Sequence, residues 1–281
     1  MKNYLSLIKF SHTIFALPFA MIGFFLAVWQ EGFSFSWQKL MLVLSCMVFA
    51  RSAAMAFNRV IDEKFDSRNP RTANREIPAG VISKYKASLF TAACMLAFMG
   101  CTYFINWLCF MLSPVALLVI LGYSYTKRFT HLSHFVLGLG LALAPVGAYL
   151  AVAGSFGLLP VLLGMAVLCW VSGFDIIYAL QDVSFDKEHA LHSVPVWIGK
   201  EKALLVSSAI HILCFACLIL IGILGHFGSW YWTGCIIFTI LLIYQHTIVK
   251  ADDLARVNVA FFTTNGIASV IFAIFVLIDI Y

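Results

Sequence analysis

Long apolar runs recur through almost the whole length of this 281-residue chain. Several of them exceed the roughly 18 consecutive apolar residues that a helix needs to cross the hydrocarbon core of a bilayer. Only 11% of the residues are charged and the mean hydropathy is +0.96, whereas a water-soluble domain carries about 25% charged residues. We therefore expect an all-α, polytopic membrane protein whose interior is helix packed on helix within the lipid bilayer.

Nine membrane-spanning helices are expected, arranged around a central cavity. The first apolar run begins near Phe10 and lacks a small-residue cleavage site, so it is expected to be kept as a helix. No domain boundary or low-complexity tract divides the chain, and residues 1–281 are expected to form a single domain. The expected spans cover approximately residues 10–30, 38–62, 84–105, 107–126, 131–153, 158–181, 202–225, 228–249 and 256–279.

The distribution of lysine and arginine predicts how these helices cross the membrane. Nearly all of the basic residues lie before the first span or in the longer loops after even-numbered spans, and only Lys39 stands near a helix end on the other side. Because basic residues mark cytoplasmic loops, we expect the N-terminus and every long loop in the cytoplasm of an inner-membrane protein, with Tyr281 outside.

Charge and cysteine usage disfavour two other classes of function. The net charge is +5, but the basic residues alternate with acids in short loops, so no nucleic-acid partner is expected. All eight cysteines lie within apolar runs, including the Cys214–Cys217 pair, and their spacing predicts packing rather than metal binding.

Two acidic clusters stand where the second and the sixth predicted helices reach the cytoplasm. In the first cluster, Asn58, Asp62 and Asp66 are spaced by four residues and share an arc of about 80° on a helix. Arg51 lies on the same face, deeper in the membrane. In the second cluster Tyr178, Asp182 and Asp186 repeat the spacing of four residues, and Asp175 extends the same face inward.

Similar segments follow the two clusters, each with a polar loop and then proline, glycine and lysine before the next helix. The clusters are four helices apart, so both helices have the same orientation. This arrangement predicts a parallel internal repeat in which the clusters face each other across one cavity.

Two facing carboxylate clusters suit the departure of diphosphate from an allylic carbon. Mg²⁺ prefers hard oxygen ligands and is usually held by one or two carboxylates together with phosphate oxygens. Ions held there would neutralise the charge that grows as the carbon–oxygen bond breaks. An apolar bundle would accept the isoprenoid chain and exclude water from the electrophilic carbon.

At these residues the sequence resembles the UbiA superfamily of intramembrane prenyltransferases. The resemblance runs from about Lys9 to the C-terminus, and the segments "FSHTIFALPFAMIG" and "ALQDVSFDKEHALHSVPVWIG" are most similar to its 4-hydroxybenzoate polyprenyltransferase group. The first family motif, NxxxDxxxD, is matched by Asn58, Asp62 and Asp66, and the second, DxxxD preceded by tyrosine, by Tyr178, Asp182 and Asp186.

The resemblance implies a Mg²⁺-dependent transfer of a polyprenyl group from polyprenyl diphosphate to a hydroxylated aromatic acid in respiratory quinone synthesis. The acceptor would be similar to 4-hydroxybenzoate or a dihydroxynaphthoate. In some relatives the acids of the second motif are adjacent, and Glu188 is a candidate to compensate for their separation here. The implied ligands of Mg²⁺–diphosphate are Asp62, Asp66, Asp182 and Asp186, supported by Asn58, with Arg68, Arg75, Lys127 and Arg128 on the diphosphate oxygens.

Several alternatives stay open at this stage. A secondary transporter would place ionisable residues near the bilayer midplane, whereas these acids gather at one surface. Arg51 would bind the acceptor carboxylate or form a structural ion pair with Asp175, and Asp175 or the released diphosphate would accept the ring proton. His131 and His134 are expected to be solvent-side residues without a role.

Overall fold

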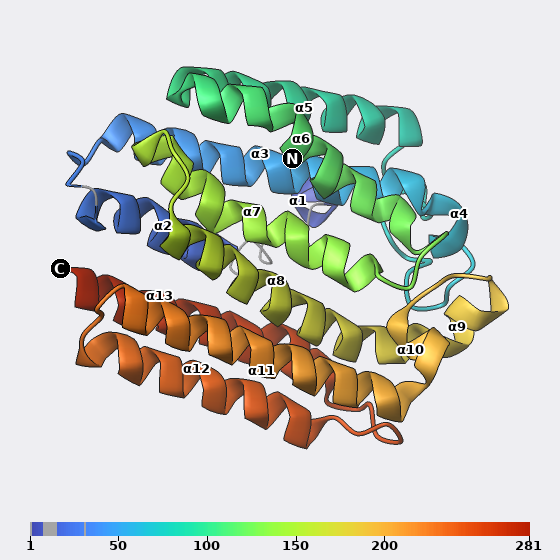
Figure 1. The fold of residues 1–281 in the computed structure, drawn as a ribbon. Coiled ribbons are helices and arrows are strands. Elements are labelled where there is room, and N and C mark those ends of the chain that lie inside the picture. The colour runs from blue at the N-terminus through green and yellow to red at the C-terminus, as the bar shows by residue number, and fades with distance from the viewer. Residues whose placement is uncertain (1, 8–15, 31) are drawn as a thin grey trace.

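A computed structural model describes residues 2–7, 16–30 and 32–281, and the described chain consists of helices and their connections, with no strand (Figure 1). The longest helices run side by side and the connections gather at the two ends of the bundle. In chain order the elements are α1 (Lys2–Leu7), α2 (Leu17–Gln30), α3 (Trp37–Ile61), α4 (Glu63–Asp66), α5 (Lys84–Ile105), α6 (Trp107–Thr126), α7 (Ser133–Ala153), α8 (Leu158–Ala179), η2 (Leu180–Asp182), α9 (Val183–Glu188), α10 (Val194–Ile198), α11 (Lys200–Leu224), α12 (Ser229–Ile248), η3 (Val259–Thr264) and α13 (Asn265–Ile280).

Eight helical segments of the described chain are long and apolar enough to cross a membrane. Helix α2 is also apolar but has 14 residues, and residues 8–15, with which the first expected span begins, lie outside the described chain. The expected all-α membrane fold is confirmed, and the expected number of nine spans is roughly consistent with this structure. The chain is therefore a multi-pass membrane protein.

The outer surface of the bundle is apolar, as contact with lipid requires. On α5 and α6, Leu96 and Phe104 are 70% exposed and Leu118 is 73% exposed. A surface with this much exposed leucine and phenylalanine would favour aggregation in water, whereas in a membrane it is in contact with the hydrocarbon chains of the lipid. Trp107 and Trp197 lie near helix ends, and about two-thirds of the surface of each is exposed. This placement is expected for aromatic anchors at a membrane interface.

Short polar and glycine-containing turns set the ends of the spanning helices. Asn106 separates α5 from α6: its side-chain oxygen accepts a hydrogen bond from the Cys109 amide at 2.8 Å, and its amide group donates to the Leu150 carbonyl at 2.8 Å. Gly154 ends α7 in the left-handed region, with φ of 68°, where a side chain would be strained. These polar groups satisfy backbone atoms at helix ends that lipid cannot.

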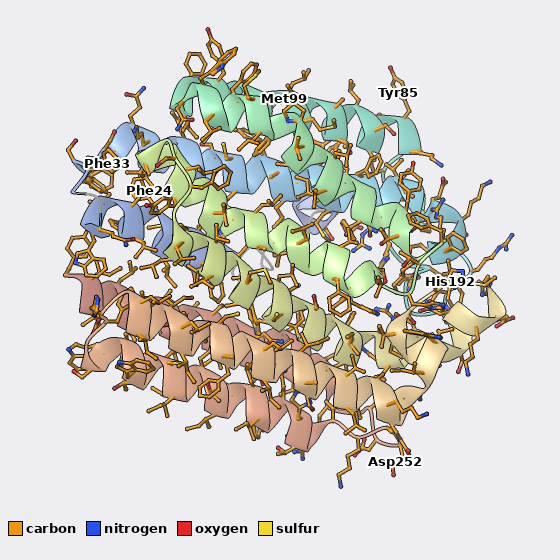
Figure 2. All side chains as sticks on the ribbon, in the orientation of Figure 1. Phe24, Phe33, Tyr85, Met99, His192 and Asp252 are labelled. Carbon is orange, nitrogen blue, oxygen red and sulfur yellow. The ribbon has the colours of Figure 1, made fainter. Side chains whose placement is uncertain are left out.

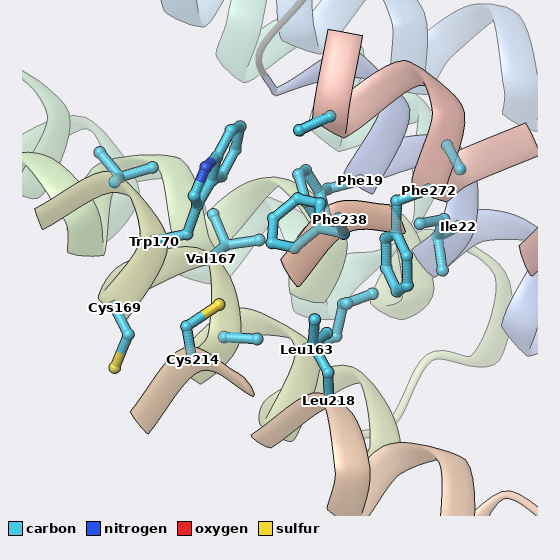
Figure 3. Packing of buried hydrophobic residues seen from close by; sticks show 14 of the residues in the cluster. Phe19, Ile22, Leu163, Val167, Cys169, Trp170, Cys214, Leu218, Phe238 and Phe272 are labelled. Atoms are coloured by element: carbon cyan, nitrogen blue, oxygen red, sulfur yellow. The ribbon is translucent and has the colours of Figure 1, made fainter. Parts of the chain in front are cut away.

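Aromatic side chains fill the core between α2, α8, α12 and α13 (Figure 3). Trp170 is fully buried, and its ring centroid lies 5.1 Å from that of Phe19 and 5.7 Å from that of Phe238. Phe272 packs against Phe19, with ring centroids 6.1 Å apart. The indole nitrogen of Trp170 donates a hydrogen bond to the Asn265 side chain at 2.9 Å. This polar contact fixes α13 against α8 within an otherwise apolar core.

The segments that follow both acid clusters lie at the same end of the bundle. In Figure 1, α4, α9 and α10 gather at one end, and the C-terminus lies at the other. Charged side chains concentrate at the first end, where Figure 2 labels His192 and Asp252, while Phe24 and Phe33 lie at the opposite end. The fold therefore brings the ends of α3 and α8 together around one space.

Candidate functional site

A cavity of about 810 Å³ opens between the ends of the helices that carry the acid clusters. This volume lies within the usual range for small-molecule sites. Every predicted site residue except Arg68 lines it; Arg68 is exposed in the loop after α4. The predicted residues around the cavity are Arg51, Asn58, Asp62, Asp66, Arg75, Lys127, Arg128, Asp175, Tyr178, Asp182 and Asp186.

Both acid clusters lie at a break in their helix, although the sequence predicted a continuous helical face. Helix α3 ends before Asp62, and Asp66 belongs to the short α4. In the second cluster, Asp182 ends the 3₁₀ turn η2 and Asp186 lies in the short α9. The first aspartates have nearly the same backbone conformation, φ −89° and ψ 4° for Asp62 and φ −99° and ψ 3° for Asp182. This sparsely populated region is frequent at active sites.

Each of the four aspartates has a basic partner from another segment of the chain. All four partners come from the loop after α4 or from the turn after α6. Three of the pairs connect segments that are distant in sequence, whereas Asp66 and Arg75 are nine residues apart. The N–O distances are 3.3 Å for Asp62 with Arg128, 2.7 Å for Asp66 with Arg75, 2.6 Å for Asp182 with Arg71 and 3.6 Å for Asp186 with Lys127.

Further hydrogen bonds orient the first cluster. The Asn58 amide group donates to Asp62 at 2.8 Å, and Arg75 Nη1 contacts both carboxylate oxygens of Asp66 at 2.7 and 2.8 Å. Arg128 also donates to the carbonyl of Ile61 at 2.8 Å, at the end of α3. Charge-assisted bonds of this length hold side chains firmly.

The density of charge shifts the proton affinity of groups at the mouth of the cavity. Burial, and then the neighbouring Asp66, raise the pKa of Asp62, against the opposing effect of Arg128. Burial by itself lowers the pKa of Lys127, but the surrounding carboxylates, Asp186 first, outweigh it and raise that pKa. Lys127 therefore stays charged here, as the binding of an anion requires.

Asp175 has a partner that the sequence did not suggest. His134 Nδ1 lies 2.6 Å from Asp175 Oδ2, and the His134 side chain is fully buried. The expectation that His134 is a solvent-side residue is therefore wrong: helix α7 begins at Ser133, so its first turn points His134 toward α8. His131 is half-buried, with its ring stacked on Trp197 at 5.4 Å.

Two arginines contribute buried nitrogen atoms without partners. The structural ion pair between Arg51 and Asp175, left open as the alternative to a ligand role, is not present in the described chain, and Asp175 contacts His134. Nε of Arg51 and Nε of Arg59 are buried and have no hydrogen-bond partner, and both residues line the cavity. Burying an N–H donor without a partner costs free energy of folding unless a bound ligand accepts its hydrogen bond.

The model of the UbiA prenyltransferase family matches residues 16–267. The chain belongs to this family. The UbiA homolog from Aeropyrum pernix K1, in its apo structure, is similar with a TM-score of 0.86 and 30% identity over 96% of this chain and 98% of that chain. A UbiA homolog from Archaeoglobus fulgidus, solved with DMAPP and Mg²⁺, has the same fold, with a TM-score of 0.76 and 22% identity over 99% of both chains.

Curated relatives of this UbiA-family chain carry the name 4-hydroxybenzoate octaprenyltransferase. The relative from Nitrosomonas eutropha is 31% identical over 226 residues, which cover 80% of this chain and 79% of its own. The relative from Edwardsiella ictaluri is 29% identical over 249 residues, covering 88% of this chain and 86% of its own. The assignment to membrane prenyltransferases thus extends over most of the sequence.

The acid clusters offer oxygen ligands rather than a ready-made metal cage. No three histidine, cysteine, aspartate or glutamate side chains converge on one point within the part of the chain that the structure describes. Oδ2 of Asp186 is buried without a hydrogen bond, and its ion-pair contact with Lys127 Nζ is 3.6 Å long, so a cation could take the place of that contact. This donor set fits Mg²⁺, which takes one or two carboxylates and completes its shell with phosphate oxygens and water.

Two basic residues that line the cavity, Arg59 and Arg71, are not among the site residues predicted from the sequence. In the sequence Arg71 is one of the many basic residues that indicate only the orientation in the membrane. Arg71 donates to both Asp182 and Tyr178, and the spacing of four residues between Arg71 and Arg75 was the available signal. Glu188, considered as a further ligand, is exposed and does not line the cavity.

A second cavity, of about 340 Å³, continues inward from the first. Arg51, Met55 and Tyr123 line both spaces, so they stand at the boundary. The walls of the second cavity come from α3, α5, α6 and α7 and are almost entirely apolar. The polar site therefore passes directly into a water-poor interior.

Proposed function

We propose that this protein transfers a polyprenyl group from polyprenyl diphosphate to a hydroxylated aromatic acid of the 4-hydroxybenzoate type, as a step in respiratory quinone synthesis. The observation that carries the proposal is the pair of acid clusters at one cavity, each carboxylate matched by a basic side chain. This set of charges suits a diphosphate bridged to carboxylates by cations. The names of the curated relatives agree with the same reaction.

Asp62, Asp66, Asp182 and Asp186 are the residues that would hold Mg²⁺ with the diphosphate of the donor. When bound, Mg²⁺ supplies electrostatic stabilisation of the negative charge that develops on the leaving diphosphate. Asn58 keeps Asp62 in place through its 2.8 Å hydrogen bond.

The basic side chains around the clusters would contact the diphosphate oxygens directly. Arg71, Arg75, Lys127 and Arg128 all line the cavity and are now paired with carboxylates. A carboxylate that takes up a cation no longer needs its basic partner, and that partner becomes available to the diphosphate. Guanidinium groups suit this task because they donate two parallel hydrogen bonds to phosphate oxygens. Arg68 is outside the cavity and is not included.

Arg51 would bind the carboxylate of the aromatic acceptor. It lies seven residues before Asn58 on α3, which places it about 10 Å deeper along the helix axis. Its buried Nε has no partner, so an acceptor carboxylate would satisfy a donor that is otherwise costly. This position holds the aromatic ring between Arg51 and the diphosphate.

The reaction then follows from these positions. The bond between C1 of the prenyl chain and the diphosphate oxygen breaks, while the ring carbon next to the phenolic hydroxyl attacks C1. The ring carbon afterwards loses its proton, and aromaticity returns. Apolar walls protect the electrophilic carbon from water, so transfer to the ring prevails over hydrolysis.

The charged end of the bundle would face the cytoplasm of the inner membrane, and residues 1–281 would act as one catalytic domain. The basic residues that surround the cavity support this orientation under the positive-inside rule. The clustering of acids at one end, rather than at the middle of the helices, also favours a transferase over a transporter.

Purified protein in detergent, assayed with a radiolabelled polyprenyl diphosphate and a panel of aromatic acceptors, tests this proposal. The panel contains 4-hydroxybenzoate, a dihydroxynaphthoate and phenol, which lacks the carboxylate. We expect labelled product with 4-hydroxybenzoate and at least tenfold less with phenol, because a lost charged hydrogen bond costs about 1.5–3 kcal/mol. No transfer to any acid of the panel would refute the proposed reaction.

A further inference from the structure

Among the described residues, His134 and Asp175 form the one close acid–histidine pair at the cavity, and binding of the diphosphate does not account for it. Asp175 lies seven residues before Asp182, about 10 Å deeper along the helix axis. It therefore stands below the acid clusters, at a depth where the ring of the acceptor would lie in the proposed function. Lining the cavity there, Asp175 can reach the substrate while His134 cannot.

The hydrogen bonds around His134 define where its proton is. The backbone N–H of Val194 points at His134 Nε2 at 3.4 Å, and an N–H group can only donate to an unprotonated nitrogen. The ring proton consequently lies on Nδ1, which donates to Asp175 Oδ2 at 2.6 Å. The fully buried ring is further held because the Ser172 hydroxyl donates to the His134 carbonyl at 3.2 Å.

This geometry divides the roles of the two carboxylate oxygens of Asp175. Oδ2 is occupied by His134, and Oδ1 has no hydrogen-bond partner among the described residues. The Asp175 side chain is 18% exposed, whereas that of His134 is 0% exposed. One oxygen of this carboxylate is held by a hydrogen bond from His134, and the other is open to the cavity. This orientation allows the open oxygen to accept a proton from a bound molecule.

We propose that Asp175 is the catalytic base that removes the ring proton of the acceptor, and that His134 is the positioning residue that aims it. After the new carbon–carbon bond forms, the ring carbon transfers its proton to Oδ1 of Asp175, and the electron pair of the broken C–H bond restores the aromatic ring. The proton then passes from Asp175 to the released diphosphate. The inference rests on the proposed function.

The structure also couples His134 to the second acid cluster. Val194 begins α10, and the preceding Ser193, in the connection that follows Asp186, is fully buried, with its carbonyl 3.3 Å from Nδ1 of His131. Ser193 caps α10 by accepting a hydrogen bond from the Val196 amide at 3.4 Å. These contacts hold the start of α10 in place, so the backbone N–H of Val194 has a defined position next to His134.

Two substitutions separate the positioning role from simple packing. Asparagine reaches about as far as Nδ1 of histidine, so His134→Asn keeps the donor toward Asp175. Glutamine reaches about as far as Nε2, so His134→Gln keeps polarity and volume but loses that donor. His131→Gln is the comparison, because His131 lies in the turn before α7 and does not line the cavity. Its Nδ1 contacts the Ser193 carbonyl at 3.3 Å rather than Asp175, so this variant changes a histidine contact with the same segment without removing the donor to Asp175.

The measurement is turnover with 4-hydroxybenzoate that carries deuterium at both ring positions next to the hydroxyl, compared with the unlabelled acid. Removal of a ring proton is normally fast, so wild-type protein and His131→Gln should show no primary isotope effect. His134→Gln should lose about tenfold in kcat, or roughly 1.4 kcal/mol, and show a primary isotope effect. His134→Asn should regain most of the turnover and lose the isotope effect.

If His134→Gln fails to fold in the membrane, the same isotope measurement is made with Asp175→Asn, which keeps the shape of the side chain. Asp175→Asn should have a low kcat and show a primary isotope effect. The absence of that isotope effect would overturn the proposal. Equal loss in His134→Asn and His134→Gln, or loss without an isotope effect, would also overturn it. A wild-type protein that prenylates no aromatic acid would instead refute the proposed function, and this inference with it.

Discussion

Arg71 holds Asp182 through two nearly parallel contacts, Nη2 to Oδ2 at 2.6 Å and Nε to Oδ1 at 3.1 Å. The same guanidinium donates to the Tyr178 hydroxyl at 3.1 Å and lies 5.5 Å from the centre of its ring. Burial opposes the charge of Arg71, but Asp182 outweighs it and raises the pKa of Arg71. The loop after the first cluster is thus joined to the second cluster by an ion pair.

The first prediction follows from this contact. A cation at Asp182 competes with Arg71 for the same oxygens, and the freed guanidinium is then able to bind the diphosphate. Arg71→Ala should raise the KM for polyprenyl diphosphate by about tenfold, since charged hydrogen bonds contribute about 1.5–3 kcal/mol, and leave the KM of the acceptor nearly unchanged. Steady-state kinetics in detergent measure both values.

Arg68→Ala is the matched control, because Arg68 is in the same loop but is exposed and outside the cavity. Its kinetics should match the wild type. If Arg71→Ala also behaves like the wild type, the contact with Asp182 has no part in donor binding.

The second prediction concerns the two clusters. Asp62→Ala and Asp182→Ala should each remove more than nine-tenths of the turnover, because each would remove a carboxylate for Mg²⁺–diphosphate. Both residues are at helix ends beside a cavity, so the variants should still fold in the membrane. Initial rates at saturating substrates measure the loss.

Glu188→Ala supplies the comparison, since Glu188 is an acid near the second cluster that does not line the cavity. It should keep wild-type turnover. A loss below tenfold in either aspartate variant, or less than about 1.4 kcal/mol, would mean that its cluster does not hold the diphosphate.

Most of the fold was predictable because lipid imposes simple rules on the sequence. The expected ends 84–105 and 107–126 coincide with α5 and α6, since Asn106 interrupts the apolar run, donates its backbone N–H to Thr102 at the end of α5 and accepts from the Cys109 amide at the start of α6. The paired spacing of aspartates predicted which helix ends meet at the cavity. Local composition and periodicity carry this information.

The partners within the site were not predictable from local sequence. Arg71 and Asp182 are 111 residues apart, and many basic residues of the loops were equally good candidates in sequence. His134 seemed solvent-exposed because it follows a polar turn, yet α8 and the start of α10 bury it completely. Such pairings depend on tertiary packing and register, which single-sequence patterns do not encode.

The third prediction separates acceptor binding from structure at Arg51. Arg51→Lys keeps the charge but loses the planar fork that matches a carboxylate. The variant should raise the KM for 4-hydroxybenzoate and leave the KM for polyprenyl diphosphate almost unchanged, with a similar Tm in detergent. A lower Tm with both KM values intact would show instead that Arg51 serves the structure alone.

The fourth prediction concerns orientation. Single cysteines at Ser67 and at Glu188, both exposed beside the acid clusters, are introduced into a protein without its eight native cysteines. Because basic residues surround this end of the bundle, both positions should react with impermeant thiol reagents only from the cytoplasmic side. Labelling from the outside would reverse the orientation and move the diphosphate site out of the cytoplasm.

The metal dependence of prenyl transfer tests the central claim most directly. Purified protein is treated with EDTA, and transfer of the labelled prenyl group to 4-hydroxybenzoate is measured before and after Mg²⁺ is returned. Since carboxylates and diphosphate repel each other without a cation between them, activity should vanish with EDTA and return with Mg²⁺. Full transfer in metal-free buffer would contradict the account, because the two acid clusters would then have no cation to hold.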